Sequence, residues 1–392
     1  MDIVCLASQD WNSHLGVPQQ IMARVAVHHR VVYVDPPRSV TSAATGGWRS
    51  LANEAPRHLD VARAADVIRV AAPGRALPIH ALPGALSRAV RAVNGRTLRG
   101  WWREMLQEHD IADPLYWVFE PASVQHLPHL PDGPVVYDCI DHWAGYFPRE
   151  GRRHANIAGM DREMARLADL IFVSSDRLYE LHRPHGDRLH LQHHAADFTH
   201  FNRAAGGDLP VAPDLAEIVA SGRKIIGLCG ILDKRVDVAS LAAIAGRRPD
   251  WHFVLVGPVQ ANLDIGPVAE RDNVTLTGMA EVSELPGYVR GFDVCLIPYL
   301  IDDFVRGIYP LKLHEYLATG RPVVSTSVPA VMPHADIVHI GDGPDGLEAA
   351  ILRALADDAP DRVSARIDLA RRNSWDVRVA EKLRLIEGIA RR

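Results

Sequence analysis

Short runs of apolar, often β-branched residues recur along the chain, and longer segments with helical spacing separate them. In the first half these runs are residues 2–8, 30–35, 67–71, 114–119, 134–138, 170–175 and 188–193. In the second half they are residues 224–230, 252–257, 273–277, 293–298, 322–327 and 336–340. Strands that are apolar throughout and alternate with helices are typical of parallel sheets covered on both faces. The pattern therefore predicts two doubly wound, Rossmann-like α/β domains.

A segment rich in Gly, Ala and Pro at 201–217 separates the two series of strands. We expect an N-terminal domain in 1–203 and a C-terminal domain in 204–374. Residues 375–392 have the spacing of an amphipathic helix with no strand after it, and we expect this helix to pack back onto the first domain. Ligands of open α/β sheets bind beyond the carboxyl ends of the strands, so two facing domains predict a site in the cleft between them.

Composition and charge narrow the class of protein. The chain has 392 residues, of which 47% are hydrophobic, and a formal charge of −5, which argues against nucleic-acid binding. The four cysteines lie far apart in or beside apolar runs, and we interpret them as buried free thiols in a reducing compartment. The N-terminus has no basic region before its short apolar run, and no run reaches the roughly 18 residues of a membrane span. We expect a cytoplasmic protein, with peripheral attachment to the inner face of the membrane as the alternative.

The stretch YPLKLHEYLATGRPVVSTSVP, residues 309–329, predicts a helix that starts near Pro310, ends at Gly320 and leads into a buried strand. Its first turns carry Lys312 and Glu315. A helix N-terminus favours anions, an ammonium group pairs with phosphate, and a carboxylate accepts hydrogen bonds from hydroxyl groups. Phosphates beside a ribose diol are a nucleotide. The alternative is an ordinary αβ unit whose two charged side chains are solvated.

Residues 273–329 resemble the C-terminal domain of the group-1 glycosyltransferases, which are nucleotide-sugar-dependent enzymes of the GT-B fold and usually retain anomeric configuration. The resemblance rests on Gly278, LPGYV at 285–289, DVCLIP at 293–298 and the block from Pro310 to Val324, all in the family's order and spacing. It implies a hexosyltransferase-like enzyme that moves a sugar from a nucleotide diphosphate sugar to an acceptor hydroxyl. The expected acceptor is a glycan or lipid-linked saccharide, bound by the N-terminal domain, in cell-surface polysaccharide or glycolipid synthesis.

The same resemblance implies roles in the donor site. Glu315 is expected to bind the ribose, the backbone around Pro310–Lys312 to face the diphosphate, and Met279 to lie near the base. The implied donor-binding residues are Gly230, Met279, Gly307, Tyr309, Pro310, Leu311, Lys312 and Glu315.

One position departs from the family's pattern. Many members have a second glutamate eight positions before the one that matches Glu315, near the transferred sugar, and this chain has Gly307 there. Asp302, Asp303 and Arg306 are the candidates to replace that glutamate.

Two basic residues follow the strand that ends at Gly230. In the family a basic residue in this loop stabilises the negative charge that develops on the leaving diphosphate. The resemblance assigns this role to Lys234 or Arg235, with Arg235 favoured as a bidentate donor. The alternative is a capped helix with exposed basic residues, in which Asp237 serves as the N-cap.

The N-terminal half offers candidates that are less specific. Asp141 or His142, just past a strand, matches a loop that in the family touches the transferred sugar, and a structural turn is the alternative. Gly16 allows backbone to approach a ligand, and His14 stands beside it. If the enzyme inverts configuration, His14, Asp141 or His142 would serve as the general base.

No cofactor and no metal are expected, because Lys, Arg and helix N-termini can stabilise the diphosphate in place of Mg²⁺. Residues 67–104 contain seven arginines and two tryptophans with no acidic residue before Glu104. This segment predicts either contact with an anionic membrane surface or an ordinary helix pair with solvated arginines. Two other functions stay open: a sugar-nucleotide epimerase of the same fold, and a non-catalytic GT-B-like partner protein.

Overall fold

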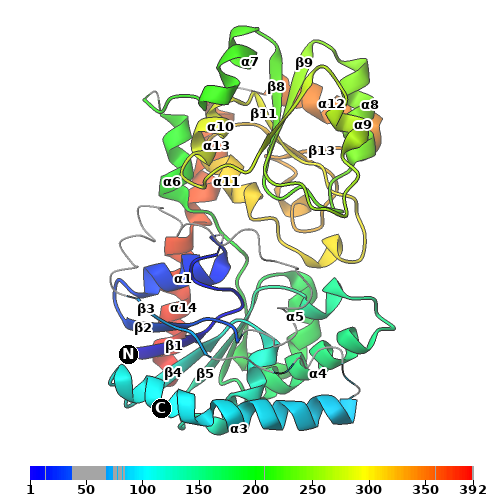
Figure 1. Cartoon of the computed structure of the whole chain (residues 1–392). Helices are drawn as coiled ribbons and strands as arrows, with labels where there is room; N and C mark the ends of the chain where they lie inside the picture. The colour runs from blue at the N-terminus through cyan, green and yellow to red at the C-terminus, as the bar shows by residue number, and fades with distance from the viewer. Residues whose placement is uncertain are drawn as a thin grey trace. The chain divides into compact units, whose positions relative to one another are not determined.

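The computed structural model describes residues 1–13, 15–37, 68–73, 77, 82, 84–206, 208–357 and 359–390 (Figure 1). The chain forms two compact units. The first comprises Met1–His193 together with Val379–Arg392, and the second comprises His194–Arg378. Each of the strands that the apolar runs predicted is present, so the α/β fold with two parallel sheets is confirmed.

The first unit is built on a seven-stranded sheet with the order β3-β2-β1-β4-β5-β6-β7, and every pair of neighbours is parallel. The central strands are buried on both faces, as their continuous apolar sequences require. The strands are β1 (Asp2–Leu6), β2 (Arg30–Val34), β3 (Arg69–Ala71), β4 (Pro114–Val118), β5 (Val135–Cys139), β6 (Leu170–Val173) and β7 (Leu189–Leu191). The strand order reverses between β1 and β4, which is the switch point where such sheets bind ligands.

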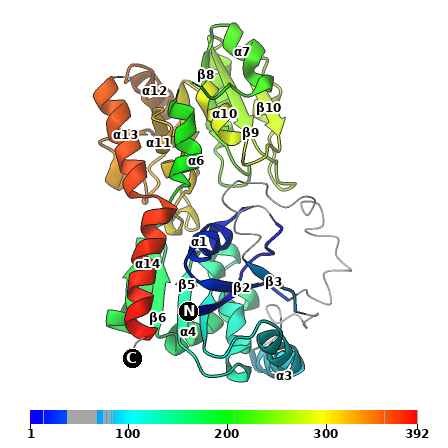
Figure 2. The ribbon, with the colours of Figure 1, turned by 90° about the vertical axis from the view of Figure 1, so that its left-hand side faces the viewer.

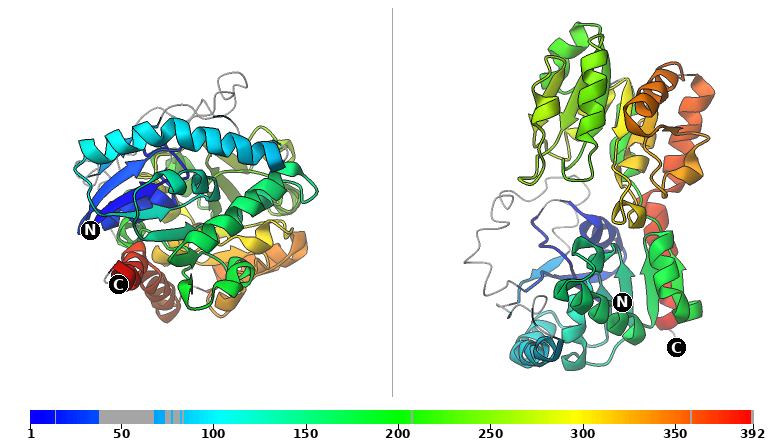
Figure 3. Two further views of the ribbon diagram at one scale, coloured as in Figure 1. Left: turned by 90° about the horizontal axis from the view of Figure 1, so that it is seen from below. Right: turned by 90° about the vertical axis from the view of Figure 1, so that its right-hand side faces the viewer.

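Helices cover this sheet, and the long α3 runs along one side of it (Figure 3). Before α14, the described residues of the first unit contain the helices α1 (Val17–Val25), α3 (Gly84–Glu108), α4 (Arg152–Leu167) and α5 (Asp176–His182). Short 3₁₀ turns connect them: η1 (Pro121–Gln125), η2 (Leu127–His129), η3 (Trp143–Tyr146) and η4 (Arg183–Arg188).

The last helix, α14 (Trp375–Ala390), begins in the second unit, and its part from Val379 onward belongs to the first (Figure 2). A buried ion pair fixes that part: Lys382 Nζ lies 2.7 Å from Asp138 Oδ2 at the end of β5. Trp117 Nε1 donates to the same carboxylate oxygen at 3.1 Å. Removing one partner of such a pair would leave an uncompensated buried charge.

The second unit has a six-stranded parallel sheet with the order β10-β9-β8-β11-β12-β13. Its strands are β8 (Lys224–Cys229), β9 (Trp251–Val256), β10 (Val274–Gly278), β11 (Val294–Ile297), β12 (Val323–Ser325) and β13 (His339–Ile340). Here the order reverses between β8 and β11, and this places the second switch point at the carboxyl ends of those two strands.

The helices of the second unit are α6 (Phe198–Asn202), α7 (Ala216–Ala220), α8 (Val238–Arg247), α9 (Gly266–Ala269), α10 (Leu285–Gly291), α11 (Lys312–Ala318), α12 (Gly343–Leu355) and α13 (Pro360–Arg372). Its 3₁₀ turns are η5 (Arg203–Ala205), η6 (Pro213–Leu215), η7 (Val305–Gly307) and η8 (Met332–His334).

The division between the units lies at His194, earlier than the expected boundary after residue 203. The reason is that α6 packs into the second unit. Asn202 Nδ2 donates to the Ala318 carbonyl at 2.8 Å, and His200 Nε2 lies 2.8 Å from the Val282 carbonyl oxygen. These bonds bind α6 to α11 and to the segment before α10, so the linker rich in Gly and Ala follows the division.

Candidate nucleotide-binding site

Glycines stand at the carboxyl ends of neighbouring strands in the second unit. Gly230 follows β8 with φ 127°, and Gly257 follows β9 with φ 138°. A Cβ on Gly257 would lie 2.1 Å from the Gly230 carbonyl oxygen, so the two strand ends touch through backbone alone. Positive φ and close approach both require glycine. Neither glycine carries a side chain that would keep a ligand away from the backbone at this edge.

Lys312 is the first residue of α11, and its side chain reaches back to this edge. The residue is 8% exposed, and a Cβ on Gly230 would lie 3.0 Å from its Nζ. The ammonium group sits over the ring of Tyr299, 5.2 Å from the centroid. Among the described residues, the Lys312 ammonium group has no ion pair or hydrogen bond. A buried ammonium without an anion is costly, which indicates that an anionic ligand completes the site.

Glu315 lies about one helical turn after Lys312 and is half-buried. Its carboxylate makes no hydrogen bond or ion pair with a described residue. Burial raises the pKa of Glu315 to about 7, the Lys312 charge lowers it in part, and Asp197 raises it further. A carboxyl group held in this way is stabilised by hydroxyl donors, and a ribose diol supplies two.

The two basic residues after β8 have different surroundings. Arg235 donates to both carboxylate oxygens of Asp233, with Nη2 to Oδ2 at 2.6 Å, and its guanidinium lies 5.3 Å from the Tyr299 centroid. Burial opposes ionisation of Asp233, but hydrogen bonds from Arg235 outweigh it and lower the pKa of that carboxyl group. Lys234 is exposed and lies over the Phe304 ring at 5.4 Å, with no ion pair among the described residues. Arg235, which the sequence favoured, is thus already paired, and Lys234 is the cation that remains available to a diphosphate.

Tyr299 is the residue here that the sequence analysis missed. Its ring is 3% exposed and lies under both Lys312 and Arg235, and its backbone pairs with Val236 of the basic loop. The signal in the sequence was an aromatic residue directly after the DVCLIP strand. Tyr299 thereby holds two cations at the switch point without neutralising either.

Several expected donor residues also make contacts within the second unit. Tyr309 Oη lies 2.8 Å from His314 Nε2, and both rings are buried. The helix α11 starts at Lys312 rather than at Pro310, because Pro310 and Leu311 form the turn before it and the Pro310 carbonyl accepts from Leu313 N–H at 3.2 Å. Gly307 is the buried last residue of the turn η7.

Two more expected contributors to the donor site are now placed. Met279 follows Gly278 and is 56% exposed, as a residue available to a base would be. Of the candidates to replace the missing glutamate, Asp302 accepts a hydrogen bond from Val305 N–H at 2.7 Å and so caps η7.

Asp237 is the N-cap of α8, and its carboxylate accepts a hydrogen bond from Ser240 N–H at 3.0 Å. This agrees with the alternative in which Asp237 serves as an N-cap.

The first unit places Asp141 and His142 just past the carboxyl end of β5. Asp141 accepts hydrogen bonds from His142 N–H at 3.0 Å and from the Tyr146 hydroxyl. Burial and the nearby Arg177 lower the pKa of His142, so its imidazole is neutral near pH 7. Gly16 is the N-cap of α1, and a Cβ there would overlap the Gln9 amide at 2.3 Å. His14 lies outside the described residues.

Glu120 is a second residue that sequence reasoning missed. It stands just beyond β4 at the switch point of the first unit and is half-buried, and its carboxylate has no hydrogen bond to a described residue. Burial raises the pKa of Glu120 to about 7. An acidic residue directly after a buried strand was the available signal. A carboxyl group that titrates near neutral pH is suited to proton transfer.

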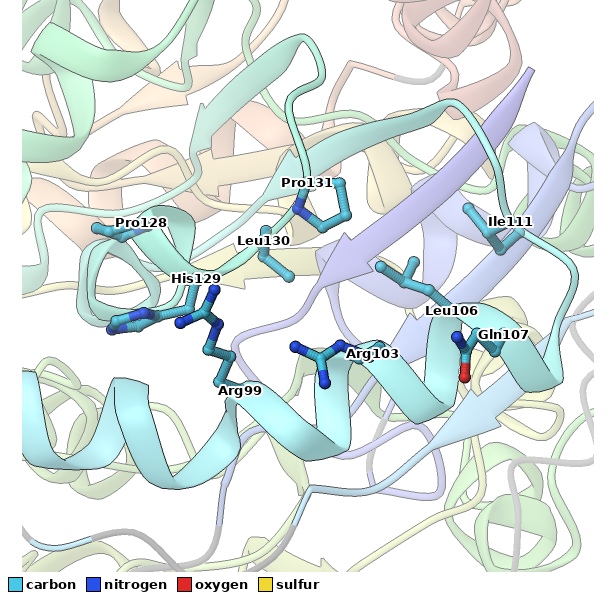
Figure 4. A pocket seen from close by; sticks show the side chains of 9 residues that line it. All are labelled: Arg99, Arg103, Leu106, Gln107, Ile111, Pro128, His129, Leu130 and Pro131. Carbon is cyan, nitrogen blue, oxygen red and sulfur yellow. The ribbon is translucent and has the colours of Figure 1, made fainter.

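The basic segment 67–104 falls partly outside the described residues, but α3 is described throughout. A groove of about 420 Å³ lies between the second half of α3 and the turn at η2, and Figure 4 shows Arg99 extending from α3 toward His129. Arg99 and Arg103 have no carboxylate partner among the described residues. Leu86 and Val93 are about half exposed on the same helix, at 50% and 49%. Of its lining residues, Ile111 lies just before β4 and Pro131 just before β5, so the groove lies at the amino edge of the sheet and away from the carboxyl edge. Within the described residues, no helix combines the length and hydropathy needed to cross a bilayer.

The chain consists of two doubly wound units. In the second, the Lys312 ammonium lies at the switch point and the Glu315 carboxyl group lies about one helical turn further along α11. This architecture is that of the GT-B class. Solved structures support this fold over the whole chain. Sucrose-phosphate synthase from Thermosynechococcus elongatus matches with a TM-score of 0.69 at 16% identity, over 99% of this chain and 98% of that one. Anabaena HepE (Alr3699), solved in complex with UDP, matches with a TM-score of 0.65 at 13% identity, over 99% and 100%. At such identities the likeness is one of fold.

Sequence comparison finds a family match in the second unit and one similar bacterial protein. Residues 223–357 match the family model described as Glycosyl transferases group 1. The putative teichuronic acid biosynthesis glycosyltransferase TuaH of Bacillus subtilis (strain 168) is 28% identical over 260 residues, which is 62% of this chain and 64% of that protein. The match thus spans less than two thirds of the relative's length. The family resemblance that the motifs in residues 273–329 carried is confirmed for residues 223–357, which match the family model.

Proposed function

We propose that this protein transfers a sugar from a nucleotide diphosphate sugar to an acceptor hydroxyl. The observation that carries the proposal is the pair Lys312 and Glu315. A buried ammonium and a half-buried carboxyl group stand one turn apart on α11, and neither has an ion pair or hydrogen bond within the described residues. Both groups gain partners at once if a diphosphate meets Lys312 and a ribose diol meets Glu315.

The chemistry follows from the charges at this switch point. Cleavage of the donor builds negative charge on the leaving diphosphate, and Lys312 and Lys234 are the cations without carboxylate partners that would stabilise it. Because lysines and backbone N–H groups carry that role, we propose that the diphosphate needs no metal ion. Retention of configuration is the expected outcome, with the leaving phosphate helping to deprotonate the acceptor and the protein supplying orientation.

Glu120 supports a role for the first unit in binding the acceptor. It stands at that unit's own switch point with a pKa of about 7, where it can accept a hydrogen bond from a sugar hydroxyl. The name of the Bacillus relative favours a cell-surface polysaccharide as the product. Peripheral attachment through α3 is a further part of the proposal, because Arg99 and Arg103 would complement anionic lipid headgroups.

A thermal-shift screen against UDP, GDP, ADP, CMP and dTDP tests the donor site. One diphosphate at 100 times its Kd should add about 2.7 kcal/mol of stability. The UDP complex of the Anabaena neighbour makes UDP the first ligand to try. The matching nucleotide sugar is then incubated with and without candidate glycan acceptors, and products are followed by NMR.

The outcomes of that second step separate the three readings. Transfer to an acceptor supports the proposal. Isomerised sugar nucleotide without an acceptor would identify an epimerase. Tight diphosphate binding with no turnover on any acceptor would identify a non-catalytic partner protein. That function is included because Gly307 stands where many family members have a glutamate.

A further inference from the structure

The first unit contains a buried cluster of three different metal-ligand types that the donor site does not use. Cys139 ends β5, Asp161 lies in α4, and His182 ends α5. Their exposed fractions are 1%, 8% and 2%. Three separate elements thus bring a thiol, a carboxylate and an imidazole to one point inside the fold.

The distances between the ligand atoms fit one metal ion. His182 Nε2 lies 3.3 Å from Asp161 Oδ2, and Cys139 Sγ lies 3.9 Å from Asp161 Oδ1. All three ligand atoms fall within 4.8 Å of one another. Around a tetrahedral Zn²⁺, ordinary bond lengths place a nitrogen and an oxygen about 3.3 Å apart and a sulfur and an oxygen about 3.5 Å apart.

A second observation points to a missing cation. His182 Nε2 is buried and has no hydrogen-bond partner, although Asp161 Oδ2 lies only 3.3 Å away. The 3.3 Å approach lacks hydrogen-bond geometry, so the imidazole does not satisfy the carboxylate as a donor. A metal ion between the two groups would satisfy both.

The surroundings supply the outer contacts that metal sites use. The Tyr137 hydroxyl donates to Asp161 Oδ1 at 2.6 Å and orients the carboxylate. The Asp141 carbonyl oxygen lies 3.4 Å from Cys139 Sγ and is a further oxygen donor close to the cluster. Hydrogen bonds to ligating carboxylates are a regular feature of such sites.

We propose that Cys139, Asp161 and His182 form a structural Zn²⁺ site. The mixed sulfur, nitrogen and oxygen donors suit zinc better than Mg²⁺ or Ca²⁺, which take oxygen. On binding, the Cys139 thiol loses its proton to solvent and the thiolate coordinates the ion, so zinc uptake releases one proton. The site is distinct from the diphosphate site, which lies in the other unit.

The ion would act on function through the loop after β5. Cys139 stands two residues before Asp141, and its sulfur touches the Asp141 carbonyl. Zinc would therefore tie the loop that carries Asp141 and His142 to α4 and α5. This consequence rests on the proposed function, but the metal site itself does not.

The test measures metal content directly. Purified protein is incubated with zinc and desalted, and its zinc content per chain is measured by inductively coupled plasma mass spectrometry. Wild type should retain one zinc ion per chain, and Cys139→Ser and His182→Gln should lose it. The matched controls are Cys295→Ser, also fully buried, and His126→Gln, a buried histidine whose Nδ1 lacks a hydrogen bond. Both controls should retain zinc.

Cobalt gives a second readout that does not depend on how well a variant folds. Co²⁺-loaded wild type should show a thiolate-to-cobalt charge-transfer band in the near ultraviolet. Wild type that retains no zinc and shows no such band would overturn the proposal, as would zinc retention unchanged in both ligand variants. A failed nucleotide screen would leave this result untouched, because neither metal measurement uses the donor.

Discussion

We expect Glu315→Gln to have opposite effects on the two properties of the second unit: it should raise the free energy of unfolding and weaken nucleotide binding. The pKa of Glu315 is raised from 4.5 to about 7, mainly by burial. A difference of about 2.5 units corresponds to about 3 kcal/mol at the extreme. Because the side chain is only half-buried, solvent screening reduces this, and we expect about 1–3 kcal/mol.

The sign follows from proton binding. Between pH 4.5 and about 7 the native state holds more protons on Glu315 than the unfolded state, so stability falls as pH rises through this window. Above pH 7 the native state bears the full free-energy cost of the ionised, partly buried Glu315 carboxylate, and below pH 4.5 this cost is absent. Glu315→Gln removes this cost, so the variant should be more stable than wild type at pH 8 and equal to it at pH 4.5.

The assay is urea unfolding at several pH values, with and without the diphosphate that the screen identifies. Without ligand the variant should have the higher midpoint at pH 8. With ligand at saturating concentration for wild type the order should reverse, because the amide cannot replace a carboxylate toward two ribose hydroxyls. Glu217→Gln, an exposed change in the same unit, is the control and should alter neither quantity. Equal stability of Glu315→Gln and wild type at pH 8, together with equal ligand affinity, would refute the reasoning.

Three further changes give independent checks. Gly230→Ala puts a Cβ at positive φ and 3.0 Å from Lys312 Nζ. The free energy of unfolding should therefore fall by at least about 1 kcal/mol, and calorimetry should show weaker diphosphate binding. Unchanged values of both would contradict the close approach. Glu120→Gln should lower turnover on the acceptor by about 100-fold while donor affinity stays constant, and a parallel loss of donor binding would count against an acceptor role. Lys382→Met leaves Asp138 buried without its cation and should cost about 3–5 kcal/mol in urea unfolding, whereas a loss below about 1 kcal/mol would show that α14 is held by other contacts.

The sequence predicted the fold well because each buried strand is a continuous apolar run with a turn signal after it. Both sheets and their parallel pairing followed from that pattern. All four cysteines are buried and none forms a disulfide, as their apolar surroundings indicated. The boundary at residue 203 was misplaced because local composition does not reveal that α6 packs against α11.

The roles of the residues in the candidate site were harder to predict from the sequence, because they depend on which charged side chains form ion pairs in the folded protein. Nothing in the order of Asp233, Lys234 and Arg235 tells which cation is neutralised, and the structure pairs Arg235 with Asp233. The burial that raises the pKa of Glu120 is likewise a property of the packed fold. The ligands of the proposed zinc site come from three separate elements, so no short spacing motif could announce them.

The central claim is that Lys312 receives the diphosphate of a nucleotide, and calorimetric titration of Lys312→Met tests it most directly. Lys224→Met is the matched control, because Lys224 is exposed and pairs with Asp293 at the amino end of β8. Loss of a charged hydrogen bond of about 1.5–3 kcal/mol should weaken diphosphate binding about 10- to 100-fold in Lys312→Met. Lys224→Met should bind as wild type does. Wild-type affinity in Lys312→Met would contradict the account.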